Sequence, residues 1–251
     1  MNKIIQSLWI GTELSNLERL SIKSFIDNGH TYHLYVYNKV KNVPQGAIIM
    51  DASEIINKRE IFTYKNGSYA AFSNLFRFTM LYKKGGYWVD TDIICIKPFD
   101  IKTDIVIATE PNKAYTGNII TSFFIKLPKR SNIALQGIKI QKYHKKKILD
   151  GTILWGSGNK TVQILVKKYN LGKYIKKWDI FCSCAYQHMR SIVSPNYKPN
   201  NKIITKLQDA PNNMICIHLW NEMWKINNIN KNDIFDPESL YEILKKKHNI
   251  K

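Results

Sequence analysis

Two aspartates separated by one residue, Asp90 and Asp92, are the side chains of this sequence best suited to chemistry. They end the stretch GGYWVDTD at residues 85–92, in which the glycine pair allows a helix to stop and the next residues favour a strand. Alternation places both carboxylates on one side of a strand, so they converge only where the strand ends or curls. Converging carboxylates repel unless a cation lies between them, and their hard oxygens suit Mn²⁺ or Mg²⁺, which also bind phosphate.

An isolated Asp-x-Asp is most often a surface turn. Here the apolar run IICI at residues 93–96 follows the pair, and a helical pattern precedes the two glycines. The aspartates therefore interrupt a segment that is otherwise buried. This context favours a metal site over a surface turn.

Residues 69–84 form the most informative predicted helix. Apolar residues cover most of its circumference, but Ser73, Asn74 and Arg77 fall within one arc of roughly 100°. A buried arginine is costly without a partner. Two interpretations stay open: this polar stripe forms a structural ion pair elsewhere, or it lines the pocket into which Asp90 and Asp92 point.

Strand-like and helix-like segments alternate along the first part of the chain. Residues 3–10, 30–37 and 47–50 are typical of strands, and residues 14–28 of a helix. This alternation predicts an α/β fold with a mostly parallel sheet, in which ligands bind beyond the carboxyl ends of the strands. Trp9 falls at such an end, where a tryptophan packs in the core, the commoner case, or stacks on a nucleobase.

The runs AFSNLFR at residues 71–77 and GGYWVDTD at residues 85–92, with the opening KIIQSLWIG at residues 3–11, carry a resemblance. They are similar to the DXD-containing sugar-binding region of family 32-type glycosyltransferases, which include capsule and lipooligosaccharide enzymes and, more distantly, the large clostridial glucosylating toxins. The resemblance implies a GT-A (Rossmann-like) nucleotide-sugar-binding fold. It also implies metal-dependent transfer of a sugar from a nucleotide sugar with retention of configuration.

The resemblance further implies roles for single residues. Asp92 would bind the Mn²⁺ or Mg²⁺ ion, Asp90 would contact the ribose and the metal shell, and Arg77 would hold the donor sugar or its phosphates. Ser73 would line the same pocket, and Trp9 would stack on uracil. Two positions depart from the family pattern: Asn74 and Trp88 stand where the family usually has Asp and Tyr.

Later segments resemble the family more weakly. Asn118 stands where a sugar-contacting Asn is common, and the run ICIHLWNEMW at residues 215–224 is similar to a C-terminal His–Trp segment. There His218 would be the third metal ligand, with Asn221 and Glu222 as alternatives, and Trp224 would close over the nucleotide. The glycine-containing loop at residues 155–161 loosely resembles a loop near the acceptor.

One GT-A domain is expected over residues 1–251. Residues 1–110 would bind the nucleotide sugar and metal, and residues 111–251 would form the acceptor half. In that second half, residues 131–143 are typical of an amphipathic helix, followed by an exposed basic run at residues 144–147. A last helix would be capped by Asp236, begin at Pro237 and pack Phe235 on Leu240, with a lysine tail at residues 245–247.

The formal charge of +19 favours anionic partners. An AT-rich genome would also enrich lysine, and no nucleic-acid motif accompanies the charge, so no nucleic-acid partner is expected. The four cysteines match no zinc spacing, and no stretch reaches the roughly 18 apolar residues of a membrane helix.

We therefore expect a bacterial cytoplasmic enzyme, peripheral at the inner face of the membrane. It would transfer a hexose from a UDP-sugar to a surface glycan, either an oligosaccharide or a glycolipid. The alternatives are a toxin-like effector that glycosylates a protein, a basic nucleic-acid-binding protein, and a metal phosphohydrolase, which would lack a second metal cluster.

Overall fold

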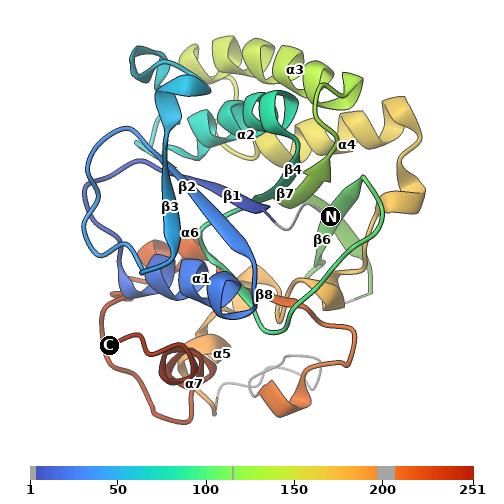
Figure 1. The fold of residues 1–251 in the computed structure, drawn as a ribbon. Helices are drawn as coiled ribbons and strands as arrows, with labels where there is room; N and C mark the ends of the chain where they lie inside the picture. The colour runs from blue at the N-terminus through green and yellow to red at the C-terminus, as the bar shows by residue number, and fades with distance from the viewer. Residues whose placement is uncertain (1–3, 115, 197–206) are drawn as a thin grey trace.

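A computed structural model describes residues 4–114, 116–196 and 207–251 (Figure 1). Its central sheet has six strands in the order β3-β2-β1-β4-β7-β6. The first four run parallel, and β7 is antiparallel to both of its neighbours. This arrangement confirms the predicted α/β class with a mostly parallel sheet. The strands are β1 (Ile4–Trp9), β2 (Thr31–Val36), β3 (Ala47–Asp51), β4 (Gly86–Val89), β6 (Val106–Pro111) and β7 (Asn118–Leu127).

A second, two-stranded sheet joins the middle of the chain to its C-terminal part. Its strands β5 (Ile93–Cys95) and β8 (Cys216–His218) are antiparallel, with Ile93 opposite His218. The register therefore brings the residue that precedes β5, Asp92, next to the end of β8. This pairing places Asp92 beside the C-terminal residues that contact it in the site described below.

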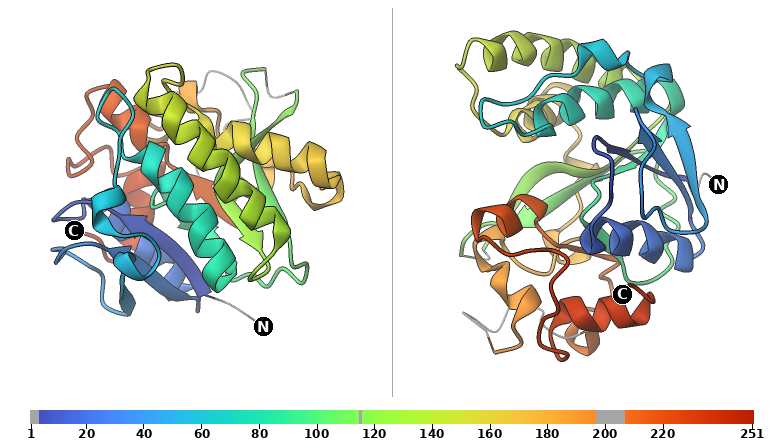
Figure 2. Two further views of the ribbon diagram at one scale, coloured as in Figure 1. Left: turned by 90° about the horizontal axis from the view of Figure 1, so that it is seen from above. Right: turned by 90° about the vertical axis from the view of Figure 1, so that its left-hand side faces the viewer.

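Helices cover both faces of the central sheet (Figures 1 and 2). On one face α2 (Ala70–Lys84) packs on α3 (Asn132–Leu149), and α4 (Ser157–Tyr169) lies beside α3 and against β7. On the other face lie α1 (Asn16–Asp27) and, farther out, α5 (Arg190–Val193) and α7 (Leu240–Lys247), while α6 (Asn221–Ile226) follows β8. Short 3₁₀ helices are Ala52–Glu54, Lys58–Glu60, Gly172–Tyr174, Trp178–Ile180, Tyr186–His188 and Leu207–Asp209.

The turn between α2 and β4 needs glycine. Gly85 ends α2 with φ 70°, and a Cβ there would lie 2.5 Å from the backbone nitrogen of Lys129. Gly86 also has a positive φ, of 84°. Because β4 ends at Val89, Asp90 to Asp92 form a turn before β5, which is one of the two arrangements that allow their carboxylates to converge.

Two predicted helices differ from the structure. The helix expected at residues 131–143 continues as α3 to Leu149, so the basic run lies within it and His144 is buried. The last helix begins at Leu240, and its cap is Ser239, whose hydroxyl accepts from the Glu242 backbone. Asp236 instead accepts from the Glu238 backbone in the preceding turn.

Phe235 lies in the C-terminal core, as the predicted contact with Leu240 requires. The centroid of the Phe235 ring lies 5.8 Å from that of Trp224 and 5.8 Å from that of Tyr241, and Phe235 packs against the core cluster that contains Leu240. Among the described residues, no helix combines the length and the apolar character needed to cross a membrane.

Candidate active site

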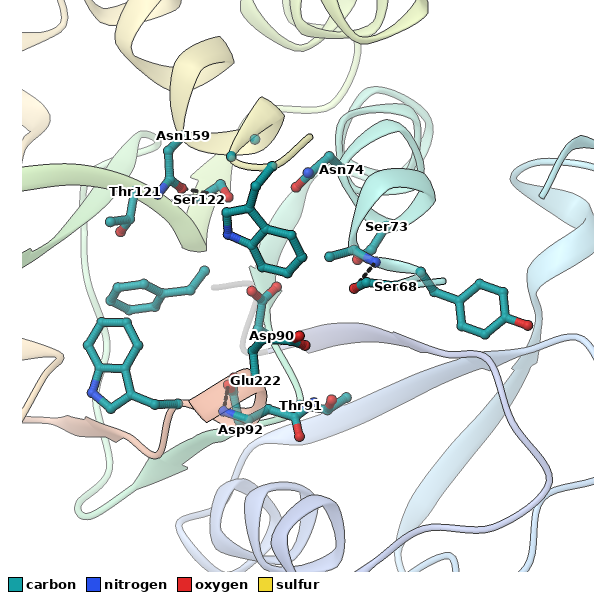
Figure 3. A pocket seen from close by; sticks show the side chains of 18 of the residues that line it. Ser68, Ser73, Asn74, Asp90, Thr91, Asp92, Thr121, Ser122, Asn159 and Glu222 are labelled. Carbon is teal, nitrogen blue, oxygen red and sulfur yellow. Dashed lines mark hydrogen bonds between the residues drawn. The ribbon is translucent and has the colours of Figure 1, made fainter. Parts of the chain in front are cut away.

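A pocket of about 920 Å³ lies at the carboxyl ends of β1 and β4. Figure 3 shows Asp90 and Asp92 in its middle, Ser73 and Asn74 on one side, and Thr121, Ser122 and Asn159 on the other. Segments far apart in the sequence meet here: the ends of β1 and β4, helix α2, strand β7, the start of α4 and the residues after β8. The position agrees with the expectation that ligands of parallel sheets bind at the carboxyl edge.

Arg77 and Asp90 form an ion pair at the pocket wall. An Arg77 guanidinium nitrogen lies 2.6 Å from Asp90 Oδ1, and Trp88 Nε1 donates to the same oxygen at 2.6 Å. Arg77 is 3% exposed and stacks over the Trp88 ring at 4.9 Å. Both interpretations of the polar stripe on α2 therefore hold at once, because the partner of Arg77 is one of the two aspartates of the pocket.

Asp92 is held by the segment that follows β8. Its Oδ2 lies 3.2 Å from His218 Nε2 and accepts from the backbone of Asn221 at 2.8 Å. The Leu219 backbone donates to the Asp92 carbonyl at 2.9 Å. Burial raises the pKa of the Asp92 carboxyl, but the charge and hydrogen bond of His218 and the Asn221 backbone outweigh burial and leave the pKa lowered. Asp92 is thus kept ionised.

The environment of Asp90 differs. Burial raises the pKa of its carboxyl, Arg77 opposes this shift, and the nearby charge of Asp92 adds to it, with a raised pKa as the result. Two carboxylates in one pocket thus repel each other. A cation bound between them would relieve this repulsion.

The donor set fits a hard divalent cation. Asp92 Oδ1 is buried and has no hydrogen-bond partner among the described residues, so one carboxylate oxygen is left for a ligand. Over the same residues, no group of three or more His, Cys, Asp or Glu side chains forms a ready-made metal cluster. Mn²⁺ or Mg²⁺ bound through one or two carboxylates takes its remaining ligands from substrate phosphates and water, which suits such a site.

Asn74 links α2 to the start of α4. Its Oδ1 accepts from Arg77 at 2.8 Å, and its Nδ2 donates to Ser157 Oγ at 3.1 Å. The Tyr64 hydroxyl lies 2.7 Å from the same Ser157 oxygen. A Cβ at Gly158 would lie 2.3 Å from Asn74 Oδ1, so only glycine fits beside this network. Asn74 lines the pocket, as predicted, while its amide orients Arg77.

The other residues predicted to bind the cofactor divide into two groups. Trp9 and Ser73 line the pocket, and the indole N–H of Trp9 donates to the Glu13 carbonyl at 3.1 Å. Asn118 lies outside the pocket, at the start of β7, where its Oδ1 accepts from Thr109 and from the Trp178 backbone.

Trp224 is also outside the pocket. It is fully buried, donates to the Leu219 carbonyl at 2.6 Å and packs on Phe235 and Tyr241 in the C-terminal core. Trp220 lines the pocket instead and stacks on His218 with ring centroids 3.9 Å apart. Trp220 has a positive φ of 57° just before α6, a geometry that the sequence pattern did not reveal.

Glu110 is a pocket residue that sequence reasoning missed. It lies on β6 and lines the pocket. Among the described residues, its carboxylate has no partner in a hydrogen bond or an ion pair. Burial raises the pKa of Glu110 to about 7, although the nearby His218 opposes the shift. The signal that could have found it is the one acidic residue in the strand pattern VIATEP, which is otherwise apolar apart from Thr109.

Comparisons with known proteins identify the class. Residues 8–111 match the sequence model of the family described as glycosyltransferase sugar-binding region containing DXD motif. This match confirms the resemblance seen in the sequence and, with the mostly parallel sheet, the predicted GT-A fold class. The chain is a glycosyltransferase, and its DXD motif is Asp90-Thr91-Asp92. No curated protein matches the chain.

Several solved structures are similar to this chain in their backbone. The PaToxG glycosyltransferase matches with a TM-score of 0.49 and 17% identity, over 68% of this chain and 70% of that one. The galactosyltransferase LgtC, in complex with donor and acceptor sugar analogs, matches with a TM-score of 0.45 and 9% identity, over 86% of each chain. The UDP-bound glycosyltransferase domain from the YGT toxin matches with a TM-score of 0.44 and 11% identity, over 100% of this chain and 86% of that one.

Proposed function

We propose that this glycosyltransferase is metal-dependent and retaining, and that it moves a hexose from a UDP-sugar to a bacterial surface glycan. The observation that carries the proposal is the convergence of Arg77, Asp90, Asp92 and His218 on one pocket. A guanidinium beside a pair of acidic oxygen ligands suits a metal-bound diphosphate better than any neutral ligand.

The donor would bind along the line from Trp9 to Arg77. Trp9, fixed by its bond to the Glu13 carbonyl, supplies an aromatic wall for the uracil base at the end of β1. Arg77 lines the pocket, and its Nε, which has no hydrogen-bond partner among the described residues, would donate to a phosphate oxygen of the bound donor. Asp92, Asp90 and His218 would hold the divalent ion, which supplies charge neutralisation at the diphosphate when bound.

The reaction would proceed by attack from the face that the diphosphate leaves. The bond between the anomeric carbon and the β-phosphate oxygen breaks, and its electron pair stays on the diphosphate. The acceptor hydroxyl oxygen bonds to the anomeric carbon on the same face, and its proton passes to the leaving phosphate oxygen. Arg77 would stabilise the negative charge that develops on the diphosphate.

Glu110 would bind a sugar hydroxyl of the substrate. Its carboxylate borders the same pocket and has no hydrogen-bonding or ion-pair partner among the described residues. A carboxylate accepts hydrogen bonds from hydroxyls strongly, and a hydrogen bond to a charged group is worth about 1.5–3 kcal/mol. In its ionised form Glu110 would supply the anionic sugar contact that Asn74, being neutral, cannot.

The acceptor is proposed to be an oligosaccharide or glycolipid at the inner face of the bacterial membrane. The excess of 38 basic over 19 acidic residues favours an anionic surface. A glycan that grows on a lipid carrier would be reached from such a surface.

A panel of nucleotide sugars tests the proposal. With Mn²⁺ present, one UDP-hexose should be hydrolysed slowly with water as the acceptor, and Asp92→Asn should abolish that hydrolysis. Stabilisation of the protein by GDP but not by UDP would overturn the choice of nucleotide. Hydrolysis that is equally fast in EDTA would overturn metal dependence, and an inverted anomeric product would overturn retention.

A further inference from the structure

Charge is unevenly distributed along this chain. Residues 111–178 contain 15 Lys and Arg but a single acidic residue, Asp150, whereas the remaining residues contain 23 basic and 18 acidic ones. A bias of the genome toward lysine codons would raise lysine everywhere. It would not remove acidic residues from one segment. The segregation therefore points to a surface with its own partner.

Two neighbouring helices of this basic segment, α3 and α4, have similar outer faces. On α3 the exposed residues recur at helical spacing, and they combine three lysines with two large apolar residues: Lys139, Lys142, Tyr143, Lys146 and Leu149. On α4 the same spacing exposes three lysines and an isoleucine: Lys160, Ile164, Lys167 and Lys168. We call these nine residues, with Leu154 and Trp155 between the helices, the α3–α4 face.

The apolar members of the α3–α4 face are well exposed. Leu149 is 65% exposed, Leu154 is 61% and Trp155 is 46%. Leu154 and Trp155 also line the pocket. Helices α3 and α4 pack on each other and lie together on one side of the molecule in the views of Figures 1 and 2. The α3–α4 face therefore extends to the mouth of the active site.

We propose that the α3–α4 face docks the enzyme on an anionic lipid bilayer. Lysines attract acidic headgroups, while leucine, isoleucine and tryptophan side chains gain by entering the interface. A nucleic acid would use the lysines for its phosphates but would leave the exposed leucines in water, so the combination favours lipid. The inference rests on the proposed function only where it names the acceptor, a lipid-linked glycan. Docking on the α3–α4 face would hold the mouth of the pocket against the bilayer that carries this glycan.

The lysine tail of α7 is a weaker candidate for this contact. Lys245 is buried and its ammonium donates to Glu242 at 2.8 Å, while Lys247 donates to the Ile96 carbonyl at 3.2 Å. Two of its three lysines are thus engaged within the protein. The lysines of the α3–α4 face enter no salt bridge among the described residues, whereas Lys145 and Lys147, elsewhere on α3, pair with Glu60 and Asp150.

Flotation with vesicles tests the proposal. The intact chain should float with vesicles of phosphatidylglycerol and phosphatidylethanolamine at low salt, float much less at high salt, and not float with phosphatidylcholine alone. The triple variant Lys139→Gln, Lys142→Gln, Lys146→Gln should reduce the bound fraction several-fold. The matched control Lys39→Gln, Lys41→Gln, Lys246→Gln removes the same charge from exposed lysines elsewhere and should float like the parent.

Leu149→Glu tests the contribution of the apolar side chains of the α3–α4 face, and it should also release the protein from anionic vesicles. Equal losses in the two triple variants would overturn the proposal, because the effect would then be one of total charge. Tight binding of duplex RNA that the first triple variant abolishes, without any vesicle binding by the parent, would assign the face to nucleic acid instead. Hydrolysis of the donor in solution should be unchanged in all these variants, so failure of docking and failure of the proposed transferase activity are separable.

Discussion

At the scale of single residues, we expect Asp92 and Asp90 to contribute similarly to activity but differently to the stability of the fold. Asp92→Asn should abolish metal-dependent hydrolysis of the donor, by roughly 10²–10³-fold or more, because it removes charge where the diphosphate is bound. The melting temperature should fall only modestly, since the amide can still accept from the Asn221 backbone although the charge that faces His218 is lost. Kinetics of donor hydrolysis and a thermal melt, measured on one preparation, check the loss of activity and the change in melting temperature.

Asp90→Ala provides the contrast. It should be nearly as inactive, but it also leaves Arg77 buried without its ionic partner and should cost about 1–3 kcal/mol of stability. If both variants melted alike, the ion pair with Arg77 would not contribute to stability.

Arg77→Lys should fail although it keeps the charge. The guanidinium reaches Asn74 with one nitrogen and Asp90 with another, and a single ammonium cannot reproduce both bonds. We expect loss of donor hydrolysis by at least about tenfold, measured beside Arg59→Lys, an exposed arginine outside the pocket. Near-normal turnover of Arg77→Lys would reduce Arg77 to a structural residue.

Glu110→Gln separates binding of the sugar from binding of the nucleotide. Loss of a charged hydrogen bond of about 1.5–3 kcal/mol should lower donor hydrolysis roughly 10- to 150-fold. Stabilisation by UDP and Mn²⁺ should remain as in the parent, because the nucleotide does not need this carboxylate. Weakened stabilisation by UDP and Mn²⁺ would instead place Glu110 among the metal ligands.

At the scale of elements, the sequence predicts best where local signals are dense. The polar stripe of α2, the glycine pair and the aspartates lie within one short stretch, and the turn at Asp90 to Asp92 is one of the two arrangements that strand alternation allows for converging carboxylates. Trp220 and Trp224 show the limit. They are four residues apart: Trp220 has a left-handed backbone and lines the pocket, whereas Trp224 is buried in the C-terminal core. No local pattern in the sequence distinguishes the two.

Contacts between distant segments explain the remaining differences. Glu110 lies in the pocket because β6 pairs with β7 at the edge of the sheet. A short sequence pattern does not predict which strands pair. Likewise α7 starts at Leu240 because Leu240 and Tyr241 are fully buried in the C-terminal core and Ser239 provides the cap. Asp236 and Pro237 are an equally good local start signal, so the choice between the two starts depends on tertiary packing.

The turn between α2 and β4 gives a prediction at this scale. Gly85→Ala should destabilise the protein strongly, because the new Cβ would meet the Lys129 backbone at 2.5 Å and the residue has φ 70°. Gly151→Ala is the control: Gly151 has φ 81°, and none of the described residues comes within 4 Å of the Cβ that alanine would add. It should cost only about 1–2 kcal/mol, the ordinary penalty of a left-handed residue. Urea unfolding of the two variants measures the difference, and equal losses would show that the contact with Lys129 relaxes.

At the scale of the whole molecule, the pocket depends on pairing between the middle of the chain and its C-terminal part. Ile93 lies opposite His218, and the Asp92 carbonyl accepts from the Leu219 backbone, so the DXD turn is fixed by the C-terminal segment. A ligand that bridges Asp92, His218 and Arg77 would therefore tie together α2, the turn after β4 and the end of β8. Such a ligand should stabilise the whole fold rather than one loop.

Thermal melts with nucleotide and metal test this expectation. At about 100 times its dissociation constant, a ligand that binds only the folded state adds about 2.7 kcal/mol, which is roughly 5–10 °C in Tm for a chain of this size. UDP with Mn²⁺ should produce such a shift, UDP with EDTA a much smaller one, and neither should stabilise Asp92→Asn to the same extent. An equal shift by UDP in EDTA would mean that Arg77 and the aromatic wall bind the nucleotide without a metal ion, and that the repulsion between Asp90 and Asp92 is relieved by Arg77 and His218 alone.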